Sequence, residues 1–287
     1  MKEARVKSGR WGLVLFICLA LVQNLQAKIA APSECNPEIL LLGNSDFRAE
    51  VMVYPAALRH QKSLILFPPT GGANFLDRSY AGAFCRAGYD VWLLKSWTGD
   101  QEFSLDLGIH QRLYERAQRA VALSLEKIQG HFVGILGTSV GGIHAAISMA
   151  FHDRLDAAFV ITAGVPIADV IATTDQEVLA DVKRQRRELF KFQSDEEYSR
   201  ALQEHILYEP TKLPRRFEGK ALGMLIATRD TTVPVKYQNV LREFWRPQTV
   251  YEISNNHFFG IIRSWLFFKG EIIDFFDQAV KAKSQRP

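Results

Sequence analysis

Three residues in this sequence have the types and the chain order needed for nucleophilic catalysis: Ser139, Asp230 and His257. A serine hydroxyl is a poor nucleophile at neutral pH, so it needs a base to accept its proton and a third group to orient that base. Histidine commonly serves as the base, and an aspartate can hold it in the productive tautomer. If the three side chains meet, they can attack a carbonyl carbon and form an acyl-enzyme on Ser139.

The surroundings of Ser139 predict a turn that exposes its hydroxyl. The serine lies in Gly137-Thr138-Ser139-Val140-Gly141, after an apolar run at 132–136 that suits a buried strand and before a helical pattern that reaches residue 151. A strand–turn–helix context of this kind gives the G-x-S-x-G pattern its meaning. We expect strained backbone at the serine, and glycine at 137 and 141 because a Cβ there would collide with the neighbouring strand or helix.

Asp230 and His257 each follow an expected strand, at 221–227 and 249–253. Ligands of open α/β sheets sit at the carboxyl ends of the strands, so both side chains can reach the rim where Ser139 lies. Each also has a structural alternative. Asp230 could cap the turn before Pro234, because Asp favours turns, and His257 could be a surface residue beside a helix N-cap.

The reaction also needs hydrogen-bond donors for the oxyanion that forms at the attacked carbonyl. The backbone N–H of Val140 is one expected donor, since the turn itself positions it. The second should come from the loop after the strand at 63–67. Pro68 and Pro69 have no N–H, so Thr70 is the expected donor and Gly71 is the alternative.

The remainder of the chain alternates strands and helices. This order predicts a mostly parallel sheet covered by helices on both faces. The first two strands are expected to form a hairpin through the turn at 43–46, and the last helical stretch to break near Gly270. The expected strands are 39–42, 47–54, 63–67, 90–94, 132–136, 157–162, 221–227 and 249–253, and the expected helices are 75–87, 106–128, 140–151, 235–245 and 258–280.

Residues 166–218 interrupt this alternation with helical patterns and no strand, which predicts an inserted cap over the strand ends. One apolar stripe is expected at Val178, Val182, Leu189 and Phe192. The basic run at 183–187 is interpreted as a solvated helix face, with an anion site as the alternative.

The first 27 residues have the pattern of a secretory signal peptide, with a basic start, an apolar stretch at 11–22 and a small residue, Ala27, at the end. An uncleaved N-terminal membrane anchor is the alternative. These 27 residues hold four of the 35 basic and one of the 31 acidic residues, which leaves 31 and 30 and a net charge of +1. The mature chain, 28–287, therefore has no basic excess that would indicate nucleic-acid binding.

Two cysteines, Cys35 and Cys85, remain in the mature chain. They can form a disulfide in an exported protein, or remain as one packed and one free thiol. No His/Cys/Asp cluster has metal-ligand spacing. His144 follows Ser139 by about one helical turn and is interpreted as a packing or supporting residue. Trp97, Phe75 and the aromatic residues of the insertion are expected to shape an apolar pocket or to pack in the core.

Together these segments resemble the α/β-hydrolase superfamily over nearly the whole mature chain. The resemblance lies in the serine turn at 137–141, in Gly88-Tyr89-Asp90-Val91-Trp92 and in Asp230-Thr231-Thr232-Val233-Pro234. Many members carry His-Gly where this chain has Pro68-Pro69, and alignment with that motif again indicates Thr70 as the oxyanion donor. The resemblance implies a cofactor-free hydrolase of esters or related acyl bonds, with a helical cap over its site.

The expected function is therefore that of an exported serine hydrolase, periplasmic or secreted, acting on a small acyl substrate and needing no metal, cofactor, nucleic acid or obligatory membrane partner. A carboxyl ester is the first choice of substrate. A small-peptide or amide hydrolase, a catalytically silent binding protein of the same fold and an acyltransferase are the alternatives. The sequence leaves the oligomeric state open.

Overall fold

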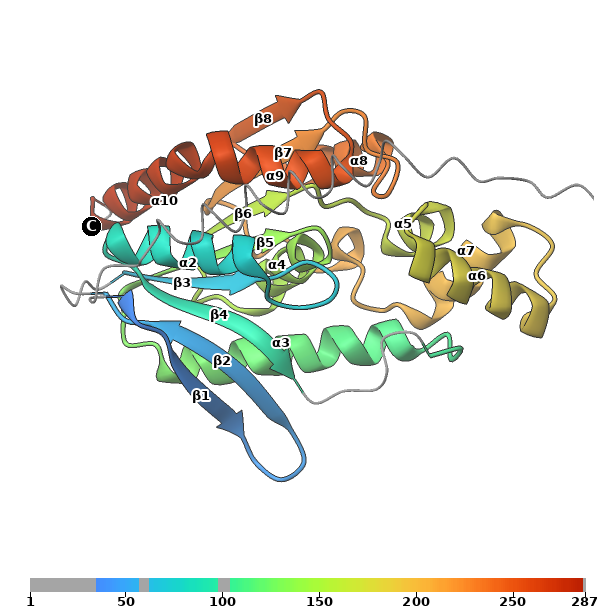
Figure 1. The fold of residues 1–287 in the computed structure, drawn as a ribbon, viewed down its shortest axis with the longest axis horizontal. Helices are drawn as coiled ribbons and strands as arrows, with labels where there is room; N and C mark the ends of the chain where they lie inside the picture. The colour runs from blue at the N-terminus through green and yellow to red at the C-terminus, as the bar shows by residue number, and fades with distance from the viewer. Residues whose placement is uncertain (1–34, 57–61, 98–103, 286–287) are drawn as a thin grey trace, which may run out of the picture.

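The computed structural model describes residues 35–56, 62–97 and 104–285 and is built around one eight-stranded sheet (Figure 1). The strand order is β1-β2-β4-β3-β5-β6-β7-β8. β1 and β2 form the expected antiparallel hairpin, β2 pairs antiparallel with β4, and all other neighbours are parallel. The predicted mostly parallel sheet is thus confirmed. The expected signal peptide at 1–27 lies outside the described residues.

The strands agree closely with the expected runs. They are β1 Glu38–Gly43, β2 Arg48–Tyr54, β3 Lys62–Phe67, β4 Asp90–Trp97, β5 Phe132–Thr138, β6 Ala157–Ile161, β7 Ala221–Ala227 and β8 Thr249–Ile253. The clearest difference is β4, which was expected to end at Leu94. The strand continues because Ser96 and Trp97 pair with Glu50 and Ala49 of β2, and Lys95 forms an ion pair with Glu50 at 2.5 Å. The apolar pattern cannot reveal these partners.

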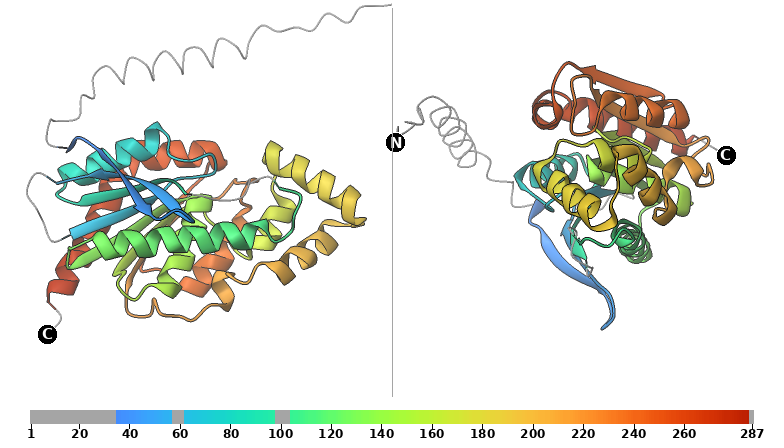
Figure 2. Two further views of the ribbon diagram at one scale, coloured as in Figure 1. Left: turned by 90° about the horizontal axis from the view of Figure 1, so that it is seen from below. Right: turned by 90° about the vertical axis from the view of Figure 1, so that its right-hand side faces the viewer.

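Helices cover both faces of the sheet (Figures 1 and 2). One face is buried mainly under α3, α4 and α8, and the other mainly under α2 and α10, with α9 alongside α2. β5 lies between these layers and is buried at all seven positions, as expected of a strand covered on both faces. The bounds are α2 Phe75–Arg86, α3 Ile109–Lys127, α4 Val140–Phe151, α8 Val235–Trp245, α9 His257–Phe267 and α10 Lys269–Ser284.

The final helical stretch breaks at Phe268, two residues before the expected position. Gly270 is the second residue of α10 and does not mark the break. The Phe268 N–H still donates to the Ser264 carbonyl, so the chain changes direction while keeping its helical hydrogen bonding.

The segment between β6 and β7 is helical, as predicted, and lies beyond the carboxyl ends of the parallel strands (Figure 1). It contains α5 Ile167–Thr173, α6 Glu177–Phe190, α7 Asp195–His205 and the short 3-10 helix η2 Pro210–Lys212. The stripe expected on α6 is only partly right: Val182 is buried, but Val178 and Leu189 are exposed. The face that α6 buries instead includes Arg186, which is 0% exposed.

The N-terminal strand region is tied to α2 by a disulfide between Cys35 and Cys85, whose Cα atoms are 6.0 Å apart. The structure therefore selects the disulfide over the two free thiols. Within the described ranges, no helix combines the length and apolar character needed to cross a membrane.

Candidate active site

Ser139 occupies the sharp turn between β5 and α4, with φ 56° and ψ −121°. A non-glycine residue in this region of backbone space is strained, and such strain is held in place only by the surrounding structure. The flanking glycines explain how the turn fits. A Cβ on Gly137 would lie 2.1 Å from the Gly141 carbonyl oxygen, and one on Gly141 would lie 2.4 Å from that of Pro68.

The structure brings Ser139, His257 and Asp230 together at the carboxyl ends of β5, β8 and β7. His257 Nε2 lies 3.0 Å from Ser139 Oγ, and His257 Nδ1 lies 2.7 Å from Asp230 Oδ2. A carboxylate can only accept, so Nδ1 carries the proton and Nε2 is free to accept from the serine hydroxyl. This arrangement can remove the serine proton as the oxygen attacks a carbonyl.

Asp230 also caps the turn before Pro234, which was the structural alternative to its catalytic role. Its Oδ1 accepts from the Val233 N–H at 2.8 Å, which closes the turn, while Oδ2 accepts from both His257 and Gln238, the latter at 3.0 Å. Gln238, on α8, also donates to the Val233 carbonyl and accepts from the Ala227 N–H. Sequence reasoning missed Gln238, since one glutamine on an amphipathic helix carries no signal of its own.

His257 is the first residue of α9, and Asn256 caps this helix by accepting from the Phe259 N–H at 3.0 Å. The loop before it is joined to the loop after β7, because the Arg229 N–H donates to the Asn255 carbonyl at 3.1 Å. This hydrogen bond fixes the loop that carries Asp230 relative to the loop that carries His257.

Val140, Thr70 and Gly71 line the same cavity as Ser139. The Val140 N–H opens α4, where a helix leaves its first N–H groups without a helical acceptor. In the loop after β3, the Gly72 N–H donates to the Pro69 carbonyl at 3.2 Å and closes a turn around Thr70 and Gly71. In the described part of the chain, neither the Thr70 nor the Gly71 N–H donates to a protein acceptor.

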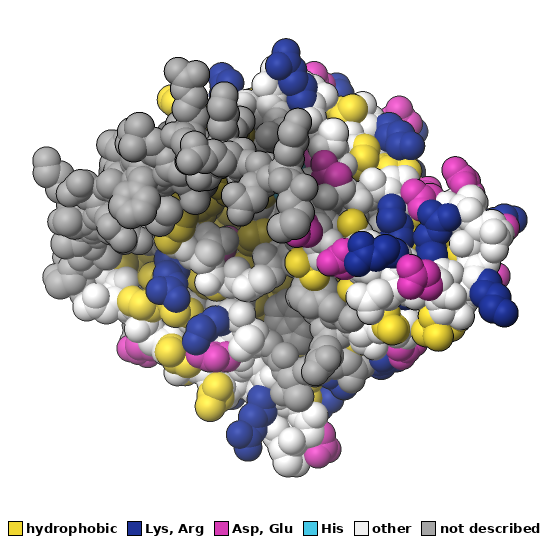
Figure 3. Space-filling view, turned by 45° about the vertical axis from the view of Figure 1, so that its right-hand side comes forward, with side chains coloured by type: hydrophobic (Ala, Val, Ile, Leu, Met, Phe, Trp, Pro, Cys, Tyr) yellow, Lys and Arg dark blue, Asp and Glu magenta, His cyan; other side chains and the backbone are white. Residues whose placement is uncertain are grey.

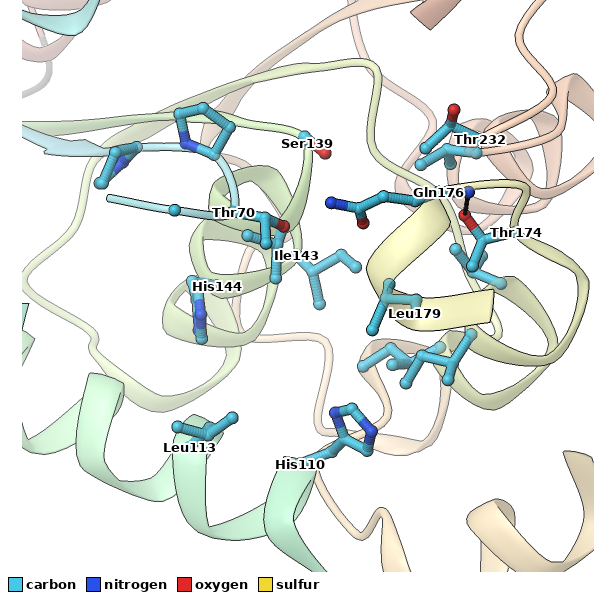
Figure 4. Close-up of a pocket in the computed structure, with 18 of the residues that line it drawn as sticks. Thr70, His110, Leu113, Ser139, Ile143, His144, Thr174, Gln176, Leu179 and Thr232 are labelled. Carbon is cyan, nitrogen blue, oxygen red and sulfur yellow. Dashed lines mark hydrogen bonds between the residues drawn. The ribbon is translucent and has the colours of Figure 1, made fainter. Parts of the chain in front are cut away.

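The cavity beside Ser139 has a volume of about 290 Å³ (Figure 4). Most of its wall is apolar, and α3, α4, α5 and α6 contribute aliphatic side chains to it: Leu113, Ile143, Ile167, Val170, Ile171 and Leu179. Of the two alternatives for Phe75, the pocket does not hold: Phe75 packs edge-on against Trp265 and does not line the cavity. The Trp97 side chain lies outside the described part of the structure, and the cavity-lining residue from α6 is Leu179 rather than an aromatic.

Two buried histidines also line the cavity. His144 on α4 stacks on Phe67 with ring centroids 5.0 Å apart, in agreement with its expected packing role, and burial lowers its pKa to about 3. His110 on α3 lies beside Arg186, and burial together with this positive charge lowers its pKa to about 3. Both rings are therefore neutral at ordinary pH.

The interpretation of residues 183–187 as a solvated face is wrong for Arg186. Its guanidinium donates to Tyr198 Oη at 2.8 Å and to the carbonyls of Ser104 and Asp106 at 2.6 and 3.0 Å. Most other charged residues of α6 and α7 face solvent, although Lys183 is largely covered and donates to the Ala172 carbonyl. Charges of both signs are interspersed over this part of the surface (Figure 3). The sequence pattern could not separate Arg186 from Lys183, Arg184 and Arg187, because all four are basic.

The insertion contacts the loop of Asp230 through a carboxylate and through Val170, which packs in one buried cluster with Val233 and Tyr237. Asp175, between α5 and α6, accepts from Thr231 Oγ1 at 2.5 Å and from Thr232 Oγ1 at 2.7 Å. These hydrogen bonds lower the pKa of Asp175 below its ordinary value, which keeps it ionised. Among the described residues, no group of three or more His, Cys, Asp or Glu side chains could hold a metal ion.

No protein-family model matches the sequence, and no curated protein matches it. Solved structures do match the fold. An esterase from Pyrococcus furiosus has a TM-score of 0.60 at 12% identity, covering 85% of this chain and 91% of its own. An α/β-hydrolase from a Penicillium species has a TM-score of 0.60 at 16% identity, covering 85% and 98%.

An acylaminoacyl peptidase from Pyrococcus horikoshii has a TM-score of 0.63 at 12% identity, with 89% of this chain covering 43% of the peptidase. This chain therefore spans less than half of the peptidase's length. With the sheet order and the serine turn described above, these similarities establish that the chain has the α/β-hydrolase fold.

Proposed function

We propose that this chain is a serine hydrolase that cleaves a carboxyl ester, or a related acyl bond, through an acyl-enzyme on Ser139. The observation that carries the proposal is the pair of hydrogen bonds from Ser139 Oγ to His257 Nε2 at 3.0 Å and from His257 Nδ1 to Asp230 Oδ2 at 2.7 Å. His257 can therefore take the proton of Ser139, and the Asp230 carboxylate can stabilise His257 once it is charged.

In the proposed reaction, His257 accepts the Ser139 proton while Oγ bonds to the substrate carbonyl carbon. The N–H groups of Val140 and Thr70, or of Gly71 in place of Thr70, donate to the oxyanion. His257 then gives the proton to the departing oxygen, which leaves as an alcohol. Water attacks the acyl-enzyme with His257 as base, and the acid is released.

The aliphatic wall of the cavity supports a substrate with an apolar group of modest size. A carboxyl ester is preferred because it is the least demanding acyl bond for a serine with a histidine base. An amide or small peptide is the second candidate, and the similarity to a peptidase of the same fold favours keeping it.

Replacing the nucleophile tests the proposal. We expect Ser139→Ala to fold normally and to lower kcat/KM for p-nitrophenyl esters by roughly a thousandfold or more, because the acyl-enzyme can no longer form. Ser148→Ala is the matched control: Ser148 is a buried serine on α4, the helix that follows Ser139, and is bonded to Gln118 and not to His257. Parent-like turnover by Ser139→Ala would remove Ser139 from the mechanism.

Assays of the wild-type protein distinguish the proposed hydrolase from a binding protein and from an acyltransferase. Folded protein that turns over no ester or amide in a broad panel would favour a catalytically silent binding protein. Transfer of the acyl group to an added alcohol in preference to water, measured by product analysis, would favour an acyltransferase.

We also propose that the protein is exported and that residues 1–27 are removed. The Cys35–Cys85 disulfide supports an oxidising compartment, because disulfides rarely persist in a reducing cytosol. N-terminal sequencing of the protein from its native compartment should begin at Lys28. A retained Met1 with membrane-bound protein would favour the N-terminal anchor instead.

A further inference from the structure

The cavity wall that faces away from the serine turn is mostly apolar, and His110 of α3 is a polar side chain within it; Thr174 and Gln176 are further polar residues of the lining. His110 is only 7% exposed, and in Figure 4 its ring points from α3 toward the space bounded by Ile143 and Leu179. Ser139 and Thr70 lie at the opposite side of this space in the same view. A substrate group that enters the cavity beside Ser139 and extends into it will therefore meet the imidazole.

The contact with Arg186 fixes which proton His110 carries. Arg186 Nη1 lies 3.2 Å from His110 Nε2. A guanidinium can only donate, so Nε2 must be the acceptor. The ring is neutral, so its single proton is on Nδ1. No described residue accepts a hydrogen bond from Nδ1, and Nδ1 is not among the fully enclosed polar atoms without a partner.

Arg186 makes this N–H an unusually strong donor. The guanidinium is 0% exposed, and no described carboxylate lies within ion-pair distance of it. It is held by Tyr198 Oη, two backbone carbonyls and His110, and its Nε has no acceptor among the described residues. A buried positive charge polarises the groups bonded to it, so it strengthens donation from the far side of the imidazole.

We propose that His110 selects substrates whose cavity-bound group is an apolar chain ending in a hydrogen-bond acceptor oxygen. The inference rests on the proposed function, since it concerns the substrate of the same site. An apolar chain without such an oxygen leaves the Nδ1–H buried without an acceptor, which is costly in an aliphatic cavity. An acceptor oxygen restores that hydrogen bond, and a carboxylate would also neutralise the charge of Arg186.

The test compares matched esters with the wild-type protein. One series consists of p-nitrophenyl esters of straight-chain acids of increasing length, each with and without a ketone next to its far end. A second series carries the same pairs on the alcohol side of a butyrate ester, so that either part of the substrate can be the one bound. A third replaces the ketone by a terminal carboxylate, which distinguishes a neutral acceptor from an anion.

We expect kcat/KM to favour the oxygenated member by roughly tenfold at the length that reaches His110, as one hydrogen bond to a polarised donor predicts. His110→Phe should abolish this ratio, while His110→Gln, which can accept from Arg186 and donate into the cavity, should retain part of it. His144→Phe is the matched control, because it replaces another buried cavity histidine and should leave the ratio unchanged.

Even if His110→Phe does not fold, the kcat/KM ratios of the wild-type protein can contradict the role of His110. Turnover of both members at equal kcat/KM at every length and in all three series would overturn the role of His110. A ratio that His110→Phe leaves intact would do the same. Absence of any turnover would instead count against the proposed hydrolase function, so the two failures are distinguishable.

Discussion

Asp230 combines two tasks in one buried carboxylate: Oδ1 closes the turn after β7, and Oδ2 receives His257 and Gln238. Its side chain is 0% exposed, so neither task can be taken over by water. Because the carboxylate is fixed by three donors, it presents Oδ2 to the histidine in one direction. The precision of the proposed site therefore depends in part on Gln238, which does not line the cavity.

Gln238→Leu should misdirect Asp230 and lower kcat/KM by roughly tenfold or more, since a hydrogen bond to a charged group is worth about 1.5–3 kcal/mol. The comparison is Gln118→Leu. Gln118 is a buried glutamine bonded to Ser148 and the His144 carbonyl. Steady-state kinetics on both variants, corrected for the folded fraction, should show a loss for Gln238→Leu alone. Equal losses would mean that Gln238 acts only on stability.

His144 should make the protein's stability depend on pH. Burial lowers its pKa from 6.5 to about 3, so the unfolded chain binds a proton that the folded chain does not. Its contribution is present above about pH 6.5 and is lost as the pH falls toward 3. His144→Phe should remove about 2 kcal/mol of the fall in unfolding free energy between about pH 7.5 and about pH 5. Denaturant titrations of both proteins across this range measure the difference. Parallel curves would show that His144 binds a proton equally in both states.

At the scale of elements, local patterns predicted most of what was found. The serine turn could be predicted because its glycines, strand and helix adjoin in the sequence. Asp230 and His257 could be located because parallel strands all end at one edge of a sheet. The roles of Gln238, Asp175 and Arg186 depend on which distant segments pack together, and no periodicity records that. For the same reason β4 was expected to end too early.

One polar link between the insertion and the site is Asp175, which bonds both Thr231 and Thr232 in the loop of Asp230. Asp175→Ala should loosen this link and raise KM for esters a few-fold, with a smaller change in kcat. The effect is modest because the carboxylate is partly solvated. Asp181→Ala in the same insertion breaks only an exposed pair with Arg184 and should leave KM unchanged. If both variants behave alike, the link to the Asp230 loop has no role in substrate binding.

For the whole molecule, the disulfide joins the start of the described chain to α2 across 50 residues of sequence. Sequence alone could not decide this pairing, because it does not give the Cα separation that a disulfide requires. The joint variant Cys35→Ser/Cys85→Ser should lose about 2–5 kcal/mol of unfolding free energy, as expected for a cross-link over a loop of this length. A reducing agent should lower the stability of the parent and not of the variant. If the reducing agent leaves the unfolding free energy of the parent protein unchanged, the thiols are not paired in solution.

The most direct test of the central claim is covalent labelling of the folded, mature protein with a fluorophosphonate, followed by peptide mass mapping. We predict one adduct, on Ser139, that forms far more slowly in His257→Ala and is absent in Ser139→Ala. Labelling that is spread over other serines, or that proceeds equally without His257, would contradict the account.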